Sequence, residues 1–241
     1  SRDEFIEAKI NENHYQPPYF RLMERLNMEG GDPAPRVPRA KNLTLSELDN
    51  CNAPHWVDVR DPMAFASGHF PGSMNLPVGM VSAFAGWYIG EEDSILLIGA
   101  DESELAGATE HLVRIALDNI IGGYTGVVSA AAAGKNMAQI PMIETDEVRT
   151  RLEADRDNWT LLDVRDADEH SEFSIDDSQH IYVGELNERW KELDKAHHYT
   201  LMCASGMRAT VAAGWLASRG FGKLDIYLGS MGAWKASQEE K

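Results

Sequence analysis

The sequence predicts an α/β fold with two domains of similar design, each built on a mainly parallel central sheet flanked by helices. The chain has 241 residues, and at roughly 100 to 200 residues per domain this length predicts two compact domains. Short apolar runs alternate with stretches of helical periodicity, as in parallel sheets with helical crossovers. The tetrapeptide Asp58–Asp61 recurs as Asp163–Asp166, an offset of 105 residues, so the second domain is predicted to repeat the first.

The first forty residues are predicted to form a helical arm and a linker rather than part of either sheet. Helical patterns cover Asp3–Ile10 and Tyr19–Asn27, and Pro17-Pro18 separates them because proline interrupts a helix. Gly30–Pro35 is rich in glycine and proline, a composition typical of connecting chain. We therefore place the arm at residues 1–40.

The first domain is predicted at residues 41–128. Thr44 and Glu47 have the spacing of a capping box, which predicts the start of a short helix. Two apolar runs predict strands, and the second of them is apolar throughout, as expected of a strand buried on both faces. The strands and the long helix that follows are predicted at Trp56–Val59, Ile95–Ile98 and Ser103–Asp118.

A linker is predicted at residues 129–141 and the second domain at residues 142–241. The linker begins with the alanine-rich stretch Ser129–Gly134, whose four alanines could equally be the end of a helix. In the second domain an apolar strand precedes a cysteine-containing loop and a helix that Gly220 stops. This strand and this helix are predicted at Tyr199–Met202 and Ala209–Arg219.

Composition argues against two classes of partner. Lys and Arg number 22 against 39 Asp and Glu, so the net charge is −17, and such a surface repels nucleic acid phosphates and anionic lipids. No apolar run approaches the roughly 18 residues that a membrane span needs. The chain has only two cysteines, too few for a disulfide framework, which favours the reducing cytoplasm and permits a reactive thiol.

Cys203 is the candidate nucleophile. It follows a buried strand at the end where open α/β sheets bind ligands, and its loop leads into a helix N-terminus. The backbone N–H groups of the loop and the helix dipole favour the thiolate, which is the nucleophilic form. Gly206 lets the loop curl, and Arg208 adds a fixed cation suited to an oxyanion such as a thiosulfonate or a carboxylate.

Several motifs together resemble tandem rhodanese domains. Cys203–Arg208 is similar to the C-x-x-G-x-R active-site loop of that family, and Asp163–Arg165 with Glu169 resembles its D-V-R-x-x-x-E segment. Gly68–Pro77 resembles the G-H-I-P-G-A-x-N-I-P segment in the first copy, where the second copy departs with Phe173–Ser178. Gly229–Trp234 matches the glycine-rich turn and tryptophan that follow the fifth strand.

The resemblance implies a role for each matching residue. Cys203 would be catalytic, and the rest of its loop would bind substrate: Ala204, Ser205, Gly206, Met207 and Arg208. Three residues would give structural support: Asp163, Arg165 and Glu169. Among these, we expect Arg165 and Glu169 to form an ion pair that frames the loop, and Asp163 to hold the loop in place.

The first copy is expected to be non-catalytic. In an ungapped register Ile98 falls opposite Cys203, and its loop, Ile98–Ser103, has two carboxylates but no nucleophile and no arginine. Ala64 also stands where the second copy has Glu169, so the support is expected to be lost together with the nucleophile. We interpret this copy as a packing partner.

The arm carries a second resemblance. Pro17–Asn27 is similar to the closing segment of metallo-β-lactamase-fold persulfide dioxygenases, which in some bacterial proteins are fused to two rhodanese domains. This implies a fused or associated dioxygenase domain as a partner. The chain has no H-x-H-x-D-H run, so we expect these 241 residues to bind no metal and no cofactor.

The predicted function is that of a sulfurtransferase. Its substrates would be small sulfur compounds: thiosulfate, or a low-molecular-weight thiol persulfide such as glutathione persulfide, with a thiol or another nucleophile as acceptor. Ala204 stands where many thiosulfate enzymes carry arginine, so one positive charge for a dianion is absent. Two alternatives stay open: a cysteine phosphatase, although its loop is C-x5-R and this one is C-x4-R, and a non-enzymatic persulfide sensor or binding module.

Some residues have plainer interpretations. Cys51 lies in polar turn sequence and is expected to be incidental, although a disulfide with Cys203 stays open if their Cα atoms lie within about 7 Å. His197-His198 is expected to be a solvated pair. Met207 and Met231 could line a pocket for a thiol, or could simply fill gaps.

Overall fold

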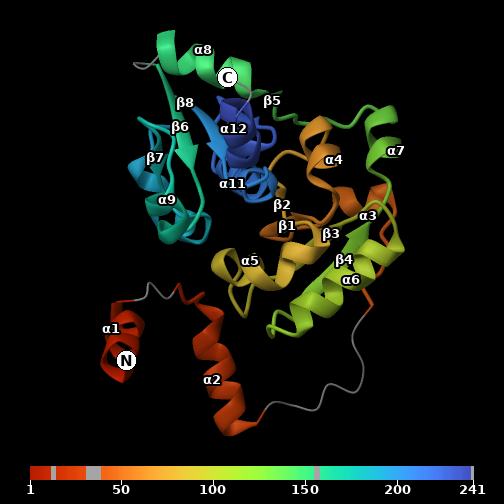
Figure 1. Ribbon diagram of the computed structural model, residues 1–241. Coiled ribbons are helices and arrows are strands. Elements are labelled where there is room, and N and C mark those ends of the chain that lie inside the picture. The colour runs from red at the N-terminus through yellow and green to blue at the C-terminus, as the bar shows by residue number, and fades with distance from the viewer. Residues whose placement is uncertain (12–14, 31–38, 155–157, 240–241) are drawn as a thin grey trace.

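The computed structural model describes residues 1–11, 15–30, 39–154 and 158–239, and it contains two parallel sheets (Figure 1). The strand orders are β2-β1-β3-β4 in the first sheet and β5-β9-β8-β6-β7 in the second. Every strand pair recorded in these sheets is parallel. The predicted α/β fold with two flanked, mainly parallel sheets is therefore confirmed.

The first domain has four strands with helices on both sides of the sheet (Figure 1). Its elements are α3 (Leu45–Asp49), β1 (His55–Asp58), α4 (Pro62–Ser67), β2 (Met74–Asn75), η1 (Val78–Met80), α5 (Val81–Tyr88), β3 (Ile95–Ile98), α6 (Glu102–Val113), β4 (Ile120–Tyr124) and α7 (Val127–Ala132). The capping box of Thr44 and Glu47 forms as predicted. Helix α6 ends earlier than the sequence pattern, because the chain turns at Ala116 with a φ of 57°.

The second domain repeats this order with one added edge strand. Its elements are β5 (Met142–Ile143), α8 (Thr145–Ala154), β6 (Trp159–Asp163), α9 (Ala167–Glu172), β7 (Gln179–His180), η2 (Val183–Glu185), α10 (Leu186–Arg189), η3 (Trp190–Glu192), β8 (His198–Met202), α11 (Met207–Ser218), β9 (Leu224–Tyr227) and α12 (Ser230–Glu239). Gly220, with a φ of 89°, follows the end of α11 as predicted. The alanine-rich stretch predicted as linker forms α7 over most of its length, since alanine has the highest helix propensity.

The predicted ungapped register of the repeat fails where β3 corresponds to β8. Asp58 pairs with Ile98, whereas Asp163 pairs with Met202, so Met202 is the counterpart of Ile98. The counterpart of Cys203 is therefore Gly99, and the predicted correspondence with Ile98 is wrong. The physical reason is that the connection leading into β8 is one residue shorter than the connection leading into β3. The loop between β8 and α11 is one residue longer than the loop between β3 and α6, which restores the register in α11.

The two domains share one hydrophobic core. Helix α11 packs on β2 and α4 of the first domain so closely that a side chain on Gly214 would approach the Asn75 nitrogen to 2.9 Å. Tyr88 of α5 donates a hydrogen bond to the Val183 carbonyl oxygen, and its ring lies 4.7 Å from the Trp215 ring. The first domain therefore packs directly against α11 and against the segment after β7.

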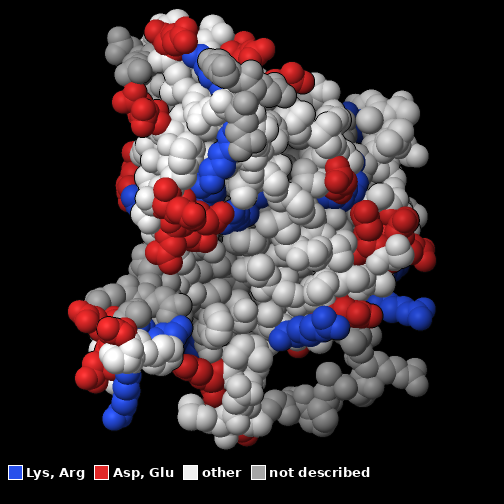
Figure 2. Space-filling model, in the orientation of Figure 1, with Lys and Arg blue, Asp and Glu red and all other residues white. Residues whose placement is uncertain are grey.

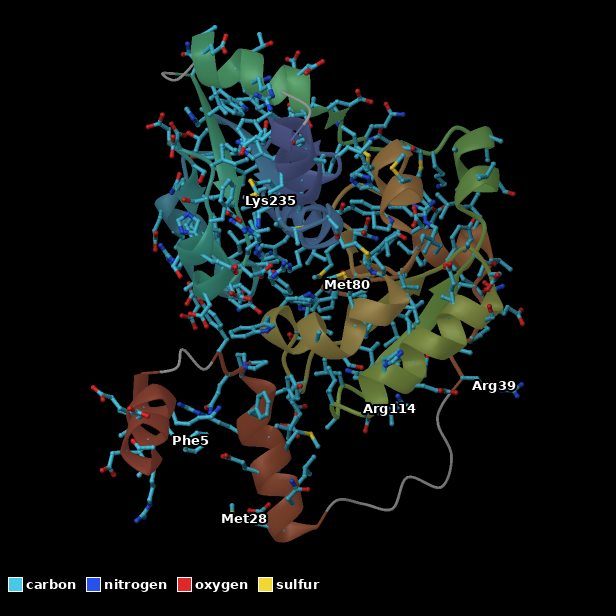
Figure 3. The ribbon with its side chains drawn as sticks, viewed as in Figure 1. Phe5, Met28, Arg39, Met80, Arg114 and Lys235 are labelled. Carbon is cyan, nitrogen blue, oxygen red and sulfur yellow. The ribbon has the colours of Figure 1, made fainter. Side chains whose placement is uncertain are left out.

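The arm consists of α1 (Arg2–Asn11) and α2 (Tyr19–Glu29), close to the predicted helices. Figure 3 shows Phe5 and Met28 on these helices, set apart from the two sheets. The Tyr19 ring fills the space beside Gly86, and Arg25 binds both oxygens of Glu91 at 2.7 and 2.8 Å. Most of the predicted linker, residues 31–35, lies outside the described residues. Within the described ranges, no helix has the length and apolarity to cross a bilayer.

Candidate active site around Cys203

Cys203 lies at the carboxyl end of β8, where its loop turns into α11. The residue is 1% exposed, so Sγ is almost completely shielded from solvent. The Gly206 N–H donates a hydrogen bond to Sγ at 3.1 Å. Gly206 adopts a φ of 104°, in the region that L side chains rarely occupy, so glycine is what allows the loop to curl back onto the sulfur.

The loop keeps free hydrogen-bond donors. Among the described residues, no acceptor is recorded for the backbone N–H groups of Ala204, Ser205, Met207 or Arg208. The last two belong to the first turn of α11, a helix of 12 residues whose dipole adds positive potential there. Free donors beside a sulfur nucleophile suit an anionic group attached to, or arriving at, that sulfur.

Ser230 holds the cysteine backbone from the other side. Its hydroxyl accepts a hydrogen bond from the Cys203 N–H at 3.1 Å and donates one to the Tyr227 carbonyl at 2.9 Å. Ser230 is fully buried with a φ of 51°, a strained conformation for a non-glycine residue. The glycine-rich turn was recognisable in the sequence, but the contact of its serine with Cys203 was not, since the two are 27 residues apart.

Two substitutions of Ser230 distinguish the effect of its hydroxyl group from the effect of its strained backbone conformation. Ser230→Ala keeps the unfavourable φ and leaves the Cys203 N–H without an acceptor, whereas Ser230→Gly relieves the strain. We expect both to lower kcat/KM about fivefold, as the loss of about 1 kcal/mol of hydrogen bonding implies. The alanine variant should be less stable to denaturant than the glycine variant by about 1 kcal/mol. Equal stability, or full activity in both variants, would show that Ser230 does not position the loop.

Arg208 is bound by Glu169. The guanidinium nitrogens lie 2.5 and 2.8 Å from the two carboxylate oxygens. The hydrogen bonds from Arg208 lower the pKa of Glu169 to about 2, so the pair is ionised at neutral pH. Glu169 is carried by α9, which starts with a capping box formed by Asp166 and Glu169 itself. The pair therefore ties the first turn of α11 to the first turn of α9.

The predicted ion pair between Arg165 and Glu169 is wrong. Arg165 instead binds the carboxylate of Asp163, with nitrogen–oxygen distances of 3.0 and 2.6 Å. Its remaining donors reach the carbonyl oxygens of Glu169 at 3.1 Å and Phe173 at 2.7 Å. Because Asp163 and two carbonyl oxygens occupy the donors of Arg165, the Glu169 carboxylate pairs with Arg208.

The first domain keeps the Asp–Arg pair after its first strand but has fewer free donors in the loop after β3. Arg60 binds Asp58 at 2.9 and 2.6 Å as Arg165 binds Asp163, while Ala64 leaves the first domain without a counterpart of Glu169, as predicted. The Ala100 N–H donates to the Glu104 carboxylate at 2.7 Å. Asp101 accepts hydrogen bonds from the Ser103 and Glu104 N–H groups. Carboxylates therefore already occupy three backbone N–H groups in this loop and at the start of α6.

A cysteine at the corresponding position should not create a second site. In Gly99→Cys the new Cβ would lie 3.1 Å from Leu105 and 3.2 Å from the Asp101 carbonyl oxygen, and the loop has no arginine. We expect no sulfur transfer above background from this variant when Cys203 is replaced by serine. Turnover near the parent level, measured in that double variant, would show that the first loop is already organised for catalysis.

The structure also locates the cysteine, methionine and histidine residues that the sequence analysis considered. Both cysteines are free, and Cys51 is half-buried against the first domain. Met231 is buried in a core cluster, whereas Met207 is 39% exposed at the start of α11. The predicted solvated histidine pair is wrong: His197 bonds Thr160 and His198 bonds Asp225, each at 2.9 Å, and both are half-buried. In the described part of the chain, no group of three His, Cys, Asp or Glu is placed to hold a metal ion.

Comparison with known proteins gives matches to both domains. The family model for the rhodanese-like domain matches residues 42–130 and 144–237. YtwF of Bacillus subtilis (strain 168), named as a candidate sulfurtransferase, is 33% identical over 103 residues, which cover 43% of this chain and 98% of YtwF. YrkF of the same organism, named as a candidate sulfur carrier protein, is 28% identical over 107 residues, 44% of this chain and 57% of YrkF.

A solved structure is also similar. The rhodanese-related protein of Thermoplasma volcanium is 28% identical, and the match covers 40% of this chain and 92% of that chain with a TM-score of 0.36. The two matches of the family model together cover most of the chain, in the same two regions where the sequence repeats. The chain therefore belongs to the rhodanese-like domain family, of which it carries two copies.

Proposed function

We propose that this chain is a sulfurtransferase that carries a sulfane sulfur as a persulfide on Cys203. The observation that supports this most is the Cys203 loop, in which a buried sulfur accepts one N–H and four further N–H groups have no acceptor among the described residues. An outer sulfur bound to Sγ would carry negative charge, and these donors would stabilise it. The sulfurtransferase and sulfur carrier names of similar proteins agree with this proposal.

The reaction has two displacement steps. The Cys203 thiolate attacks the sulfane sulfur of the donor, the new S–S bond forms, and the donor's own S–S bond breaks with its electron pair leaving on sulfite or on a thiolate. The acceptor then attacks the outer sulfur, and Cys203 leaves as the thiolate. Ala204, Ser205, Gly206, Met207 and Arg208 would surround the transferred sulfur, while Asp163, Arg165 and Glu169 would hold the loop.

The donor is proposed to be thiosulfate or a low-molecular-weight thiol persulfide, such as glutathione persulfide. The resemblance of the arm to the end of a persulfide dioxygenase suggests such a domain, fused or associated, as a partner that uses the same class of substrate. We place the reaction in the cytoplasm, since a free catalytic thiol persists in a reducing compartment.

Turnover with different substrates tests this proposal. We expect release of sulfite from thiosulfate, or of thiol from a thiol persulfide, with ping-pong kinetics and no hydrolysis of a phosphate ester such as p-nitrophenyl phosphate. Phosphate ester hydrolysis that depends on Cys203 would instead support a cysteine phosphatase. A persulfide that forms once and is never passed to any acceptor would support a sensor.

A further inference from the structure

The mouth of the Cys203 site has little free positive charge. Arg208 is the one basic residue in the loop, and Glu169 binds both arms of its guanidinium. Asp166 adds negative charge beside Arg208, and together with Asp168 and Glu185 it adds negative charge around Tyr15. Figure 2 shows acidic side chains gathered over α9. A small dianion such as thiosulfate would meet the backbone N–H groups of the loop but no unpaired cation of the loop, and the carboxylates on α9 would repel it.

The arm contacts the start of α9 through Tyr15. The Tyr15 ring lies 4.1 Å from the Tyr182 ring, and its hydroxyl accepts a hydrogen bond from the Ala167 N–H at 3.1 Å. Ala167 is the first residue of α9, the helix that carries Glu169. Burial raises the pKa of Tyr182 and the charge of Arg208 opposes the rise, as expected of a ring close to that arginine.

The first domain also contacts Tyr182, through Trp87. The Trp87 ring packs edge-on to Tyr182 at 5.9 Å, and a side chain on Gly184 would approach it to 2.7 Å. Tyr15 and Trp87 also line a cavity of about 310 Å³ together with Glu185 and Glu188. The arm, the first domain and the catalytic domain therefore meet around Tyr182.

We propose that Tyr15 and Tyr182 form a specificity wall that directs the Cys203 site to organic thiol persulfides rather than to thiosulfate. This inference rests on the proposed sulfurtransferase function. An organic persulfide carries an apolar or peptide-like body that packs against aromatic rings, which offsets the weak attraction for its charge. Thiosulfate has no such body and would need the positive charge that Glu169 neutralises.

The test compares kcat/KM for glutathione persulfide and for thiosulfate in the full chain. We expect the parent to prefer the persulfide. Tyr15→Ala should lower kcat/KM for the persulfide about tenfold, mainly through KM, while the value for thiosulfate stays within about twofold. Tyr15→Phe keeps the ring and should keep most of the preference. Phe20→Ala is the matched control, because Phe20 stacks on Tyr19 within the same arm, and it should leave the ratio unchanged.

Two results would overturn the inference alone: a parent enzyme that prefers thiosulfate, or a Tyr15→Ala variant in which both donors lose activity equally. The second would mean that Tyr15 only stabilises the fold, and thermal unfolding of each variant reports that role separately. Absence of transfer from both donors in the parent would overturn the sulfurtransferase assignment, and this inference with it.

Discussion

Cys203→Ser is expected to abolish sulfur transfer and to leave the fold intact. A serine hydroxyl does not form a persulfide at neutral pH, yet it nearly preserves the shape of the side chain and accepts the Gly206 hydrogen bond that Sγ now accepts. Turnover with thiosulfate and with a thiol persulfide should fall to background, while the unfolding transition should keep its midpoint within a few degrees.

Cys51→Ser is the matched control. Cys51 is a free, half-buried cysteine of the first domain, and its substitution should leave turnover close to that of the parent. If Cys51→Ser lost activity and Cys203→Ser kept it, the nucleophile would be misassigned.

Arg208→Lys is expected to lower kcat/KM by about tenfold or more, and Arg208→Ala by more than that. Lysine is a point charge that cannot donate to both oxygens of Glu169 at once, so the tie between α11 and α9 loosens. Arg189→Lys is a suitable control, because Arg189 forms the same kind of bidentate ion pair with Glu192 at an exposed position. Unchanged kinetics in both Arg208 variants would show that the pair has no part in the reaction.

The pH dependence of this ion pair has a definite sign. The pKa of Glu169 is lowered to about 2, below its ordinary value of 4.5. The stability that the pair contributes is therefore fully present at pH values above the ordinary pKa of 4.5, and it is lost as the pH falls towards the lowered pKa of about 2. The difference in stability between the parent and Glu169→Gln, measured by denaturant unfolding, should therefore be constant between pH 5 and 8 and should shrink as the pH falls below 4.5.

Local patterns in the sequence were sufficient for many elements of the fold. The apolar run Ile95–Ile98 forms β3, and the spacing of Thr44 and Glu47 forms the capping box, because both depend on neighbouring residues alone. The register of the repeat could not be obtained this way. The connection into β8 is one residue shorter and the loop after β8 one residue longer than in the first domain, so the flanking helices stay aligned and only strand pairing reveals the shift.

The candidate site was predictable in its motifs and not in its contacts. The cysteine loop is continuous in sequence, so its residues could be named. The partner of Glu169 is fixed by the approach of α11 to α9, and the contact of Tyr15 with Ala167 joins residues 152 positions apart. Such contacts depend on how the arm and the two domains pack together, which no periodicity records.

The most direct test of the central claim is the intact mass of the protein after incubation with each donor, followed by peptide mapping. We predict one added sulfur atom, located on Cys203, that a thiol acceptor removes and that is absent from Cys203→Ser. A protein whose mass does not change with either donor, or whose added sulfur maps to Cys51, would contradict the account.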